Sequence, residues 1–174
     1  MNAAITPLIS QEEIRSRLLD LSAELNHDYN GKEVLMLMVM KGAFCFAADL
    51  MRLLTFPVTI EYVSASSYGH RGKEKGELTV KGLTEISLAG KNVLIVDDIF
   101  DTGHTLHYVV SEVEKKHPRT LKTVVLLLKE HPRALAYTPD YFLFTIGDCF
   151  VVGYGMDFKE HHRQLPAICT LEAP

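Results

Sequence analysis

The stretch of residues 93–105 constrains the fold of this chain most, because it joins an apolar strand to paired acids and a turn of small residues. Residues 93–96 are four apolar side chains, three of them β-branched, which is typical of a strand covered on both faces. Asp97 and Asp98 follow at its carboxyl end, where open α/β sheets place their ligands. Residues 101–105 then offer backbone amides, two hydroxyls and the start of a helix, which suit a phosphate group. The stretch therefore predicts an α/β fold that binds a sugar phosphate.

The structural alternative is a capped helix after a buried strand, with Asp101 as the N-cap. Capping accounts for one acid and one threonine, whereas residues 97–105 contain three acids and two threonines. A nucleotide P-loop is excluded, because the chain contains no Gly-x-x-x-x-Gly-Lys-Ser/Thr sequence. The pattern therefore favours a ligand site over a purely structural turn.

Composition indicates an ordinary soluble globular protein. The chain has 174 residues, of which 47% are hydrophobic and 23% are charged. We see no repeat, low-complexity segment or linker, so we expect a single domain over residues 1–174. The formal net charge of −4 gives no support for a nucleic-acid-binding surface.

The cysteines and the apolar runs bear on where the protein resides. Cys45, Cys149 and Cys169 are widely spaced and form no Cys-x-x-Cys pair, which predicts reduced thiols. The chain begins with no signal peptide, and no apolar run approaches transmembrane length. We therefore expect a cytoplasmic protein that binds neither nucleic acid nor membrane.

Hydrophobic periodicity predicts strands that alternate with helices. A capping box at Ser10 precedes an apolar stripe at helical spacing that ends near Gly31. Further helices are predicted over residues 42–54 and from Leu106 to before Pro118, and strands over residues 34–40, 58–63, 93–96, 123–128, 141–146 and 150–154. This alternation predicts a mainly parallel sheet flanked by helices. Residues 66–82 are rich in glycine and charge, so we expect this segment to move.

The motif of residues 93–105 resembles the phosphoribosyl-pyrophosphate (PRPP) signature of the type I phosphoribosyltransferases. Four more segments, in the family's order, resemble its branch acting on the 6-oxopurines hypoxanthine and guanine: Met40-Lys41-Gly42, Ser66-Ser67-Tyr68-Gly69, the segment that starts at Lys129, and residues 150–157 followed by Arg163. The resemblance covers residues from about 34 to 166. It implies the type I phosphoribosyltransferase fold, a central mainly parallel sheet flanked by helices, with a small hood and a mobile lid loop.

The resemblance also implies a role for each matching residue at the PRPP end of the site. Asp97 and Asp98 would hold the ribose hydroxyls, directly or through Mg²⁺, and Asp101 would be the catalytic base that takes the purine proton from N7. The backbone of the Lys41-Gly42 step, which often carries a cis peptide in the family, would bind pyrophosphate. The expected PRPP contacts are Lys41, Gly42, Asp97, Asp98, Asp101, Thr102, Gly103, His104, Thr105 and Arg163.

At the base end, the residue matching Lys129 donates to O6 of the purine, which selects against the amino group of adenine. Phe150 would stack on the base, and the backbone at Val151 would read its Watson–Crick edge. Asp157 would lie near the base and bind a Mg²⁺ ion on pyrophosphate. The expected cofactor is therefore Mg²⁺, with Asp97, Asp98 and Asp157 as metal-binding residues, while Ser67 and Tyr68 belong to the lid.

Each of these residues also has a simpler interpretation when it is viewed alone. Lys129 could be an exposed strand-end lysine whose stem covers apolar neighbours. Lys41 could mark a strand exit, and Asp157 could be a surface acid after a glycine turn. The sequence departs from the family at Asp97, where relatives often carry Glu, at Cys149, where many carry Lys, and in a more highly charged lid.

The function implied by the resemblance is transfer of the 5-phosphoribosyl group from PRPP to hypoxanthine or guanine, which forms IMP or GMP and pyrophosphate. Another base, such as xanthine, uracil or orotate, stays open as the acceptor. A PRPP-sensing regulator on the same fold is a second alternative, and a catalytically silent interaction module is a third. Members of the family are usually dimers or tetramers, so the resemblance implies a homodimer or homotetramer.

Overall fold

The computed structural model describes residues 4–67, 78–130 and 137–171. Two sheets organise them, a six-stranded sheet with the order β4-β3-β2-β5-β6-β7 and a three-stranded sheet with the order β1-β9-β8. The large sheet consists of β2 (Val34–Met40), β3 (Val58–Ser67), β4 (Leu78–Lys81), β5 (Asn92–Phe100), β6 (Thr120–Lys129) and β7 (Tyr141–Ile146). The small sheet consists of β1 (Ile5–Ile9), β8 (Val151–Val152) and β9 (Ile168–Leu171).

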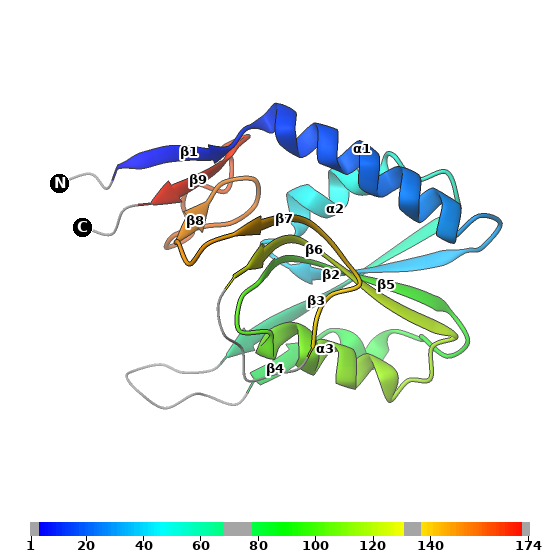
Figure 1. Ribbon diagram of the computed structural model, residues 1–174. Helices are drawn as coiled ribbons and strands as arrows, with labels where there is room; N and C mark the ends of the chain where they lie inside the picture. The colour runs from blue at the N-terminus through cyan, green and yellow to red at the C-terminus, as the bar shows by residue number, and fades with distance from the viewer. Residues whose placement is uncertain (1–3, 68–77, 131–136, 172–174) are drawn as a thin grey trace.

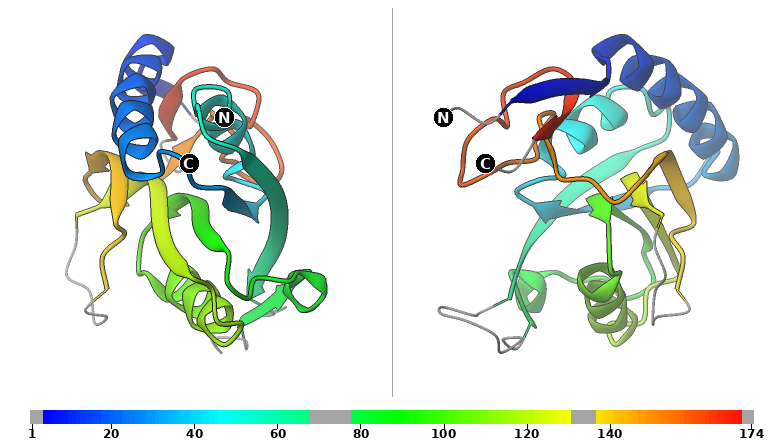
Figure 2. Two further views of the ribbon diagram at one scale, coloured as in Figure 1. Left: turned by 90° about the vertical axis from the view of Figure 1, so that its right-hand side faces the viewer. Right: turned by 60° about the vertical axis from the view of Figure 1, so that its left-hand side comes forward.

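Helices cover both faces of the large sheet. α1 (Gln11–Asp28) and α2 (Phe44–Met51) lie over one face, and α3 (His104–Glu114) lies over the other (Figure 1). A short 3₁₀ helix, η1 (Leu83–Glu85), follows β4. The small sheet lies beside the large one and pairs the first strand, β1, with the last strand, β9 (Figure 2). This arrangement is the expected central sheet flanked by helices, with the small sheet as the hood.

β2 is apolar along its whole length, and β5 and β6 contain apolar runs, because each face of the large sheet has its own core. In β2, Val34 and Met36 pack with α1 and α2, whereas Leu35 and Leu37 pack with α3. Residues 93–96 of β5 and 124–126 of β6 alternate in the same way. Successive strand residues point to opposite faces, so a strand covered on both sides needs apolar residues at every position. Full burial of each such side chain stabilises the fold by about 1.5–3 kcal/mol.

The strand order places a crevice at the centre of the large sheet. From β2 the chain passes to β3 on one side, and it later returns to β5 on the other side of β2. β2, β3, β5, β6 and β7 are parallel, and β4 is antiparallel to β3. Loops after β2 and β5 therefore diverge at the carboxyl ends of these strands, and such a switch point is where open α/β sheets bind ligands.

Several predicted boundaries are confirmed and others are wrong. The predicted strands at residues 34–40 and 141–146 coincide with β2 and β7, and Ser10 caps α1 through the expected capping box with Glu13. β5 continues to Phe100, so Asp97 and Asp98 lie within the strand rather than after it. The predicted strand end was wrong because the pairing of β5 with β6 continues beyond the two acids to Phe100. Within this stretch, the Asp98 amide donates to the Asp97 side chain.

Other elements differ in length or were not predicted. α2 is shorter than the predicted helix over residues 42–54, and β8 keeps two of the residues in the predicted strand over 150–154. β1, β4 and β9 were not predicted. Four of the five residues of β1 are exposed, so no alternation of apolar and polar residues marks it as a strand.

The expected lid begins within a strand. Ser67 ends β3 and pairs with Leu78 of β4, so part of the glycine-rich segment is an antiparallel ladder. Tyr68, the other expected lid residue, lies outside the described residues. Within the described part of the chain, no helix has both the length and the apolar character needed to cross a membrane.

Candidate active site

Three chain segments converge in van der Waals contact at the switch point, and glycines allow them to do so. A Cβ atom on Gly42, just after β2, would overlap with the carboxylate of Asp98 on β5. A Cβ atom on Gly155, in the turn after β8, would overlap with the carbonyl oxygen of Gly42. The peptide bond between Met40 and Lys41 is cis. The loop after β2 is therefore held between β5 and the turn that leads to Asp157.

Asp97 and Asp98 form a buried acid pair at this point. Asp97 is 4% exposed, and its Oδ1 accepts a hydrogen bond of 3.0 Å from the amide of Asp98. Burial raises the pKa of both carboxyl groups, and the adjacent charge of Asp98 raises that of Asp97 further. The positive charge of Arg163 opposes this rise in the pKa of Asp98. Two carboxyl groups in such surroundings attract a cation.

The turn after β5 has the geometry of an anion site. Gly103 is the N-cap of α3, with φ of 83°, and a Cβ atom there would come within 2.8 Å of the Phe100 ring. The first bond of the helix ladder joins the amide of His107 to the carbonyl of Gly103 at 2.9 Å. The amides of residues 103–106 precede this ladder and therefore have no intrahelical acceptor. Such a helix start stabilises a bound phosphate.

The capping alternative for this turn is wrong. The N-cap is Gly103 rather than Asp101, and no side chain caps this end of α3. Asp101 instead lies 3.4 Å from Lys129, measured from its Oδ2 to Nζ. Thr102 and His104 are exposed, and Thr105 is half-buried in the first turn of the helix. Asp101 therefore faces Lys129 and is not the N-cap residue of the helix.

Lys129 links the phosphate turn to the expected base site. Its side chain is 11% exposed, so the interpretation as an exposed surface lysine is wrong. The Nζ atom lies between two carboxylates, 3.4 Å from Asp101 and 3.5 Å from Asp148. Phe150 is 50% exposed, and its ring lies edge-on to Phe158 with 5.7 Å between the ring centroids. Phe150 stands two residues after Asp148, and an exposed aromatic ring together with a buried lysine suits a flat ligand that carries a hydrogen-bond acceptor.

Lys41, Asp157 and Arg163 meet in one cluster of ion pairs. Arg163 contacts Asp157 at 2.7 Å and donates to the carbonyl oxygen of Gly155 at 2.8 Å. Glu160 joins the cluster, because its carboxylate lies 3.1 Å from Lys41 and 3.2 Å from Arg163. The structure thus brings together three residues that the resemblance assigned to the pyrophosphate end of the site.

Glu160, Asp148 and Phe158 were missed in the sequence analysis. The first contacts three expected site residues, and each of the others contacts one. Glu160 and Lys41 are 119 positions apart, so no local pattern could have paired them. The acid at position 148 had a weak signal, since it stands two residues before the expected stacking ring.

The oxygen ligands of the site fit Mg²⁺ bound together with a phosphate ligand. Among the described residues, no group of three or more His, Cys, Asp or Glu side chains is placed to hold a metal ion. Mg²⁺ is usually bound by one or two carboxylates together with water and substrate phosphates, and such a site needs no larger cage. Asp97, Asp98 and Asp157 supply carboxylate oxygens of this kind.

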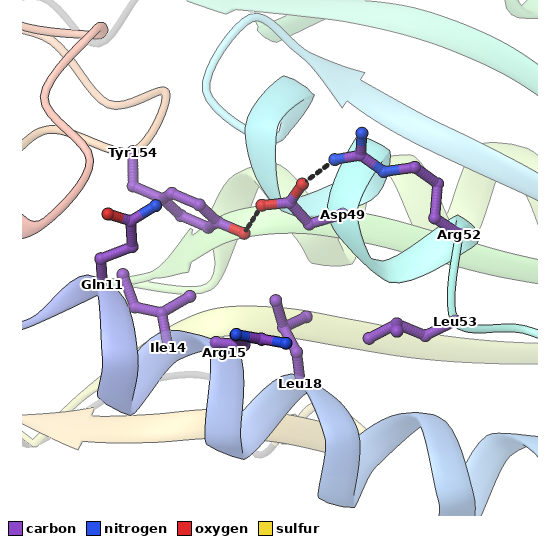
Figure 3. Close-up of a pocket in the computed structure, with 8 residues that line it drawn as sticks. All are labelled: Gln11, Ile14, Arg15, Leu18, Asp49, Arg52, Leu53 and Tyr154. Atoms are coloured by element: carbon purple, nitrogen blue, oxygen red, sulfur yellow. Dashed lines mark hydrogen bonds and ion pairs between the residues drawn. The ribbon is translucent and has the colours of Figure 1, made fainter.

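A separate cavity of about 250 Å³ lies between α1 and α2 (Figure 3). Its wall includes Tyr154, whose hydroxyl donates to Asp49 at 2.7 Å, and Asp49 is also paired with Arg52. None of the expected site residues lines it. Since Tyr154 precedes Gly155, these contacts anchor the turn after β8 to α2 from the side opposite the acid pair.

Comparison with known proteins agrees with this geometry. A family model described as the phosphoribosyl transferase domain matches residues 10–159. The chain belongs to this family. This phosphoribosyltransferase chain is 36% identical over 166 residues to the hypoxanthine-guanine phosphoribosyltransferase of Aquifex aeolicus, a match that covers 95% of this chain and 93% of the relative.

Solved structures of phosphoribosyltransferases superpose closely on the chain. A hypoxanthine-guanine phosphoribosyltransferase from Bacillus anthracis gives a TM-score of 0.90 at 37% identity, covering 98% of this chain and 100% of that chain. The hypoxanthine phosphoribosyltransferase of Trypanosoma cruzi in complex with the product IMP gives 0.87 at 36% identity, covering 95% and 93%. The fold is therefore the type I phosphoribosyltransferase fold that the sequence resemblance implied.

The packing of Gly42 yields a prediction about this phosphoribosyltransferase. We expect Gly42→Ala to lower the free energy of unfolding by about 1–3 kcal/mol, because the added methyl group overlaps with Asp98 in a tightly packed site. Urea unfolding followed by circular dichroism measures the change. Gly147→Ala is the matched control, since a Cβ atom at that position meets nothing within 4 Å. Equal unfolding midpoints for the two variants would contradict the packing described here.

Proposed function

We propose that the protein is a purine salvage enzyme that transfers the 5-phosphoribosyl group of PRPP to N9 of hypoxanthine or guanine. The products are IMP or GMP and pyrophosphate. The observation that carries the proposal is the contact of 3.4 Å between Lys129 and Asp101. It places a cation suited to a 6-oxo group beside an acid suited to N7, at the edge of a phosphate-binding turn. Relatives that carry the name hypoxanthine-guanine phosphoribosyltransferase support the same activity.

The turn after β5 would hold the 5′-phosphate. The amides at the start of α3 would donate to this phosphate, and the hydroxyls of Thr102 and Thr105 would add donors on the same turn. Gly103 lets the turn pack closely against the Phe100 ring, because it carries no Cβ atom that would overlap with the ring. The side chain of His104 is exposed and is free to contribute a contact with the phosphate.

Asp97 and Asp98 would bind the ribose hydroxyls, and the opposite end of the crevice would bind pyrophosphate. Lys41 and the backbone at Gly42 approach from one side, and Arg163 approaches from the other. A guanidinium group forms paired hydrogen bonds with phosphate oxygens, which suits it to this role. Mg²⁺, held by Asp97, Asp98 and Asp157, would neutralise charge on the departing pyrophosphate.

The chain's own carboxylates would stabilise the transition state. As pyrophosphate leaves, C1 of the ribose gains positive charge, and the nearby acid pair lowers the energy of that charge. Asp101 would accept the N7 proton while N9 attacks C1. Lys129 would donate to O6. To make this contact, its ammonium group would give up one of its two carboxylate partners, Asp101 or Asp148. Phe150 would stack on the purine, and the backbone at Val151 would read its edge.

We further propose that residues 1–174 act as one domain in a cytoplasmic homodimer or homotetramer. The domain proposal is supported by a family match that spans most of the chain. A Trypanosoma cruzi relative of known structure was studied for the role of its C-terminal region in its oligomeric state and enzymatic activity, which supports the proposal of an assembly. Multi-angle light scattering after gel filtration measures the assembly directly.

The proposed activity is tested by a spectrophotometric assay with PRPP, Mg²⁺ and a panel of bases. We expect turnover with hypoxanthine, guanine or both, and none with adenine, because Lys129 can donate only to an acceptor. Turnover with xanthine, uracil or orotate instead would replace the proposed substrate. PRPP binding without turnover of any base would favour a PRPP-sensing regulator.

The role of Asp101 is tested by Asp101→Asn. We expect kcat to fall by at least about 10²-fold, because positioned proton transfer contributes about 10²–10⁴-fold and an amide cannot accept the proton. Asp20→Asn is the control, since Asp20 is an exposed residue on α1 that pairs with Arg17. Unchanged turnover in the Asp101 variant, with the fold intact by circular dichroism, would remove this residue from the mechanism.

The role of Lys129 is tested by Lys129→Gln. We expect KM for hypoxanthine to rise by about 10- to 100-fold with a smaller change in KM for PRPP, since a hydrogen bond from a charged donor is worth about 1.5–3 kcal/mol. Lys122→Gln is the matched control, because Lys122 is also a lysine of β6 but pairs with Asp140. A parallel rise in both KM values would show that Lys129 does not act on the base.

A further inference from the structure

Glu160 occupies both cations of the proposed pyrophosphate subsite. Its two carboxylate oxygens lie 3.2 and 3.1 Å from the Nζ atom of Lys41. One of them also lies 3.2 Å from Nη2 of Arg163. Lys41 follows β2 and Arg163 follows the turn after β8, so a single side chain joins the two sides of the crevice.

The backbone around Glu160 is shaped to bring this carboxylate inward. Lys159, Glu160 and His162 have φ values of 51°, 66° and 77°, a region that residues with a Cβ atom rarely adopt. The Glu160 amide donates to Asp157 Oδ2 at 2.8 Å, and Phe158 forms a bridge with His161. The turn is therefore folded back on Asp157, and the fold itself presents Glu160 to Lys41.

The Glu160 carboxylate makes the same kind of contact with Lys41 and Arg163 that phosphate oxygens would make. It offers two oxygens and one negative charge at hydrogen-bond distance from an ammonium and a guanidinium group. Lys41 and Arg163 lower the pKa of Glu160, so the group is charged when it faces them. The pair is also weak, because the Lys41 and Glu160 side chains are 64% and 65% exposed and water screens their attraction. A ligand with more negative charge can displace it.

We propose that Glu160 is a built-in competitor of the pyrophosphate group, which holds Lys41 and Arg163 in the free enzyme and yields them when PRPP or pyrophosphate binds. This inference rests on the proposed function. Arg163 keeps its contacts with Asp157 and the Gly155 carbonyl during the exchange, so it remains in place and changes one partner. The competition weakens the binding of pyrophosphate and so assists release of this product.

The opposite role for Glu160 would be to position the two cations for the substrate. The two roles predict opposite changes in pyrophosphate affinity when the Glu160 carboxylate is removed. Removal of a competitor tightens pyrophosphate binding, whereas removal of a positioning group weakens it. The sign of one binding measurement therefore decides between them.

The test is isothermal titration of pyrophosphate, at fixed Mg²⁺ concentration, into the wild-type protein and Glu160→Gln. We expect Kd to fall by about threefold to tenfold in the variant, the range for loss of two exposed ion pairs. KM for PRPP falls with it, and KM for hypoxanthine does not change. Glu24→Gln on α1 makes the same change in net charge and leaves Kd unchanged. Glu160→Asp keeps the charge but shortens the reach, and its Kd lies between those of the wild type and Glu160→Gln.

An unchanged or higher Kd in Glu160→Gln overturns the inference, while catalysis by the wild type leaves the proposed function standing. Wild-type protein that binds no pyrophosphate and turns over no purine overturns both. If Glu160→Gln does not fold, the titration of Glu160→Asp decides, and a Kd at or above that of the wild type again overturns the competitor role.

Discussion

The close approach of three backbone segments at Gly42 is the constraint on which the site depends. The loop after β2 fits between the carboxylate of Asp98 and the turn at Gly155 because neither glycine carries a Cβ atom. A side chain at either position would separate the acid pair from the turn that carries Asp157 and Arg163. The residues proposed to bind ribose and those proposed to bind pyrophosphate are adjacent for this reason. Contacts behind the turn, from Tyr154 to Asp49, hold the same arrangement from α2.

Each cation of the site faces at least one carboxylate. Lys129 faces Asp101 and Asp148, Arg163 faces Asp157, and Lys41 faces Glu160. A substrate with several negative charges would therefore bind by exchange of partners rather than by filling an empty basic pocket. Such exchange keeps polar groups paired in both states, which avoids the cost of leaving a half-buried charge without a partner. Specificity and release then depend on the internal partners as well as on the cations themselves.

Sequence reasoning found the elements whose signal is local and strong. β2 and β7 were predicted at their observed bounds, and the capping box at Ser10 begins α1 as expected. It did not find β1, since four of its five residues are exposed and its partner β9 lies at the other end of the chain. It ended β5 too early, because two acids ordinarily mark a strand end, whereas the pairing of β5 with β6 continues past them.

The sequence by itself determined the fold class and the chemical types of the site, because apolar runs, a glycine turn and a spaced set of acids and threonines are properties of neighbouring residues. The roles expected of Asp101, Lys129 and Arg163 came from the resemblance of the motifs to a known family. Only the tertiary structure decided which of them meet. The contacts between Lys129 and Asp101, and between Lys41 and Glu160, join residues far apart in the chain, and strand order and loop packing alone bring such residues within hydrogen-bond distance.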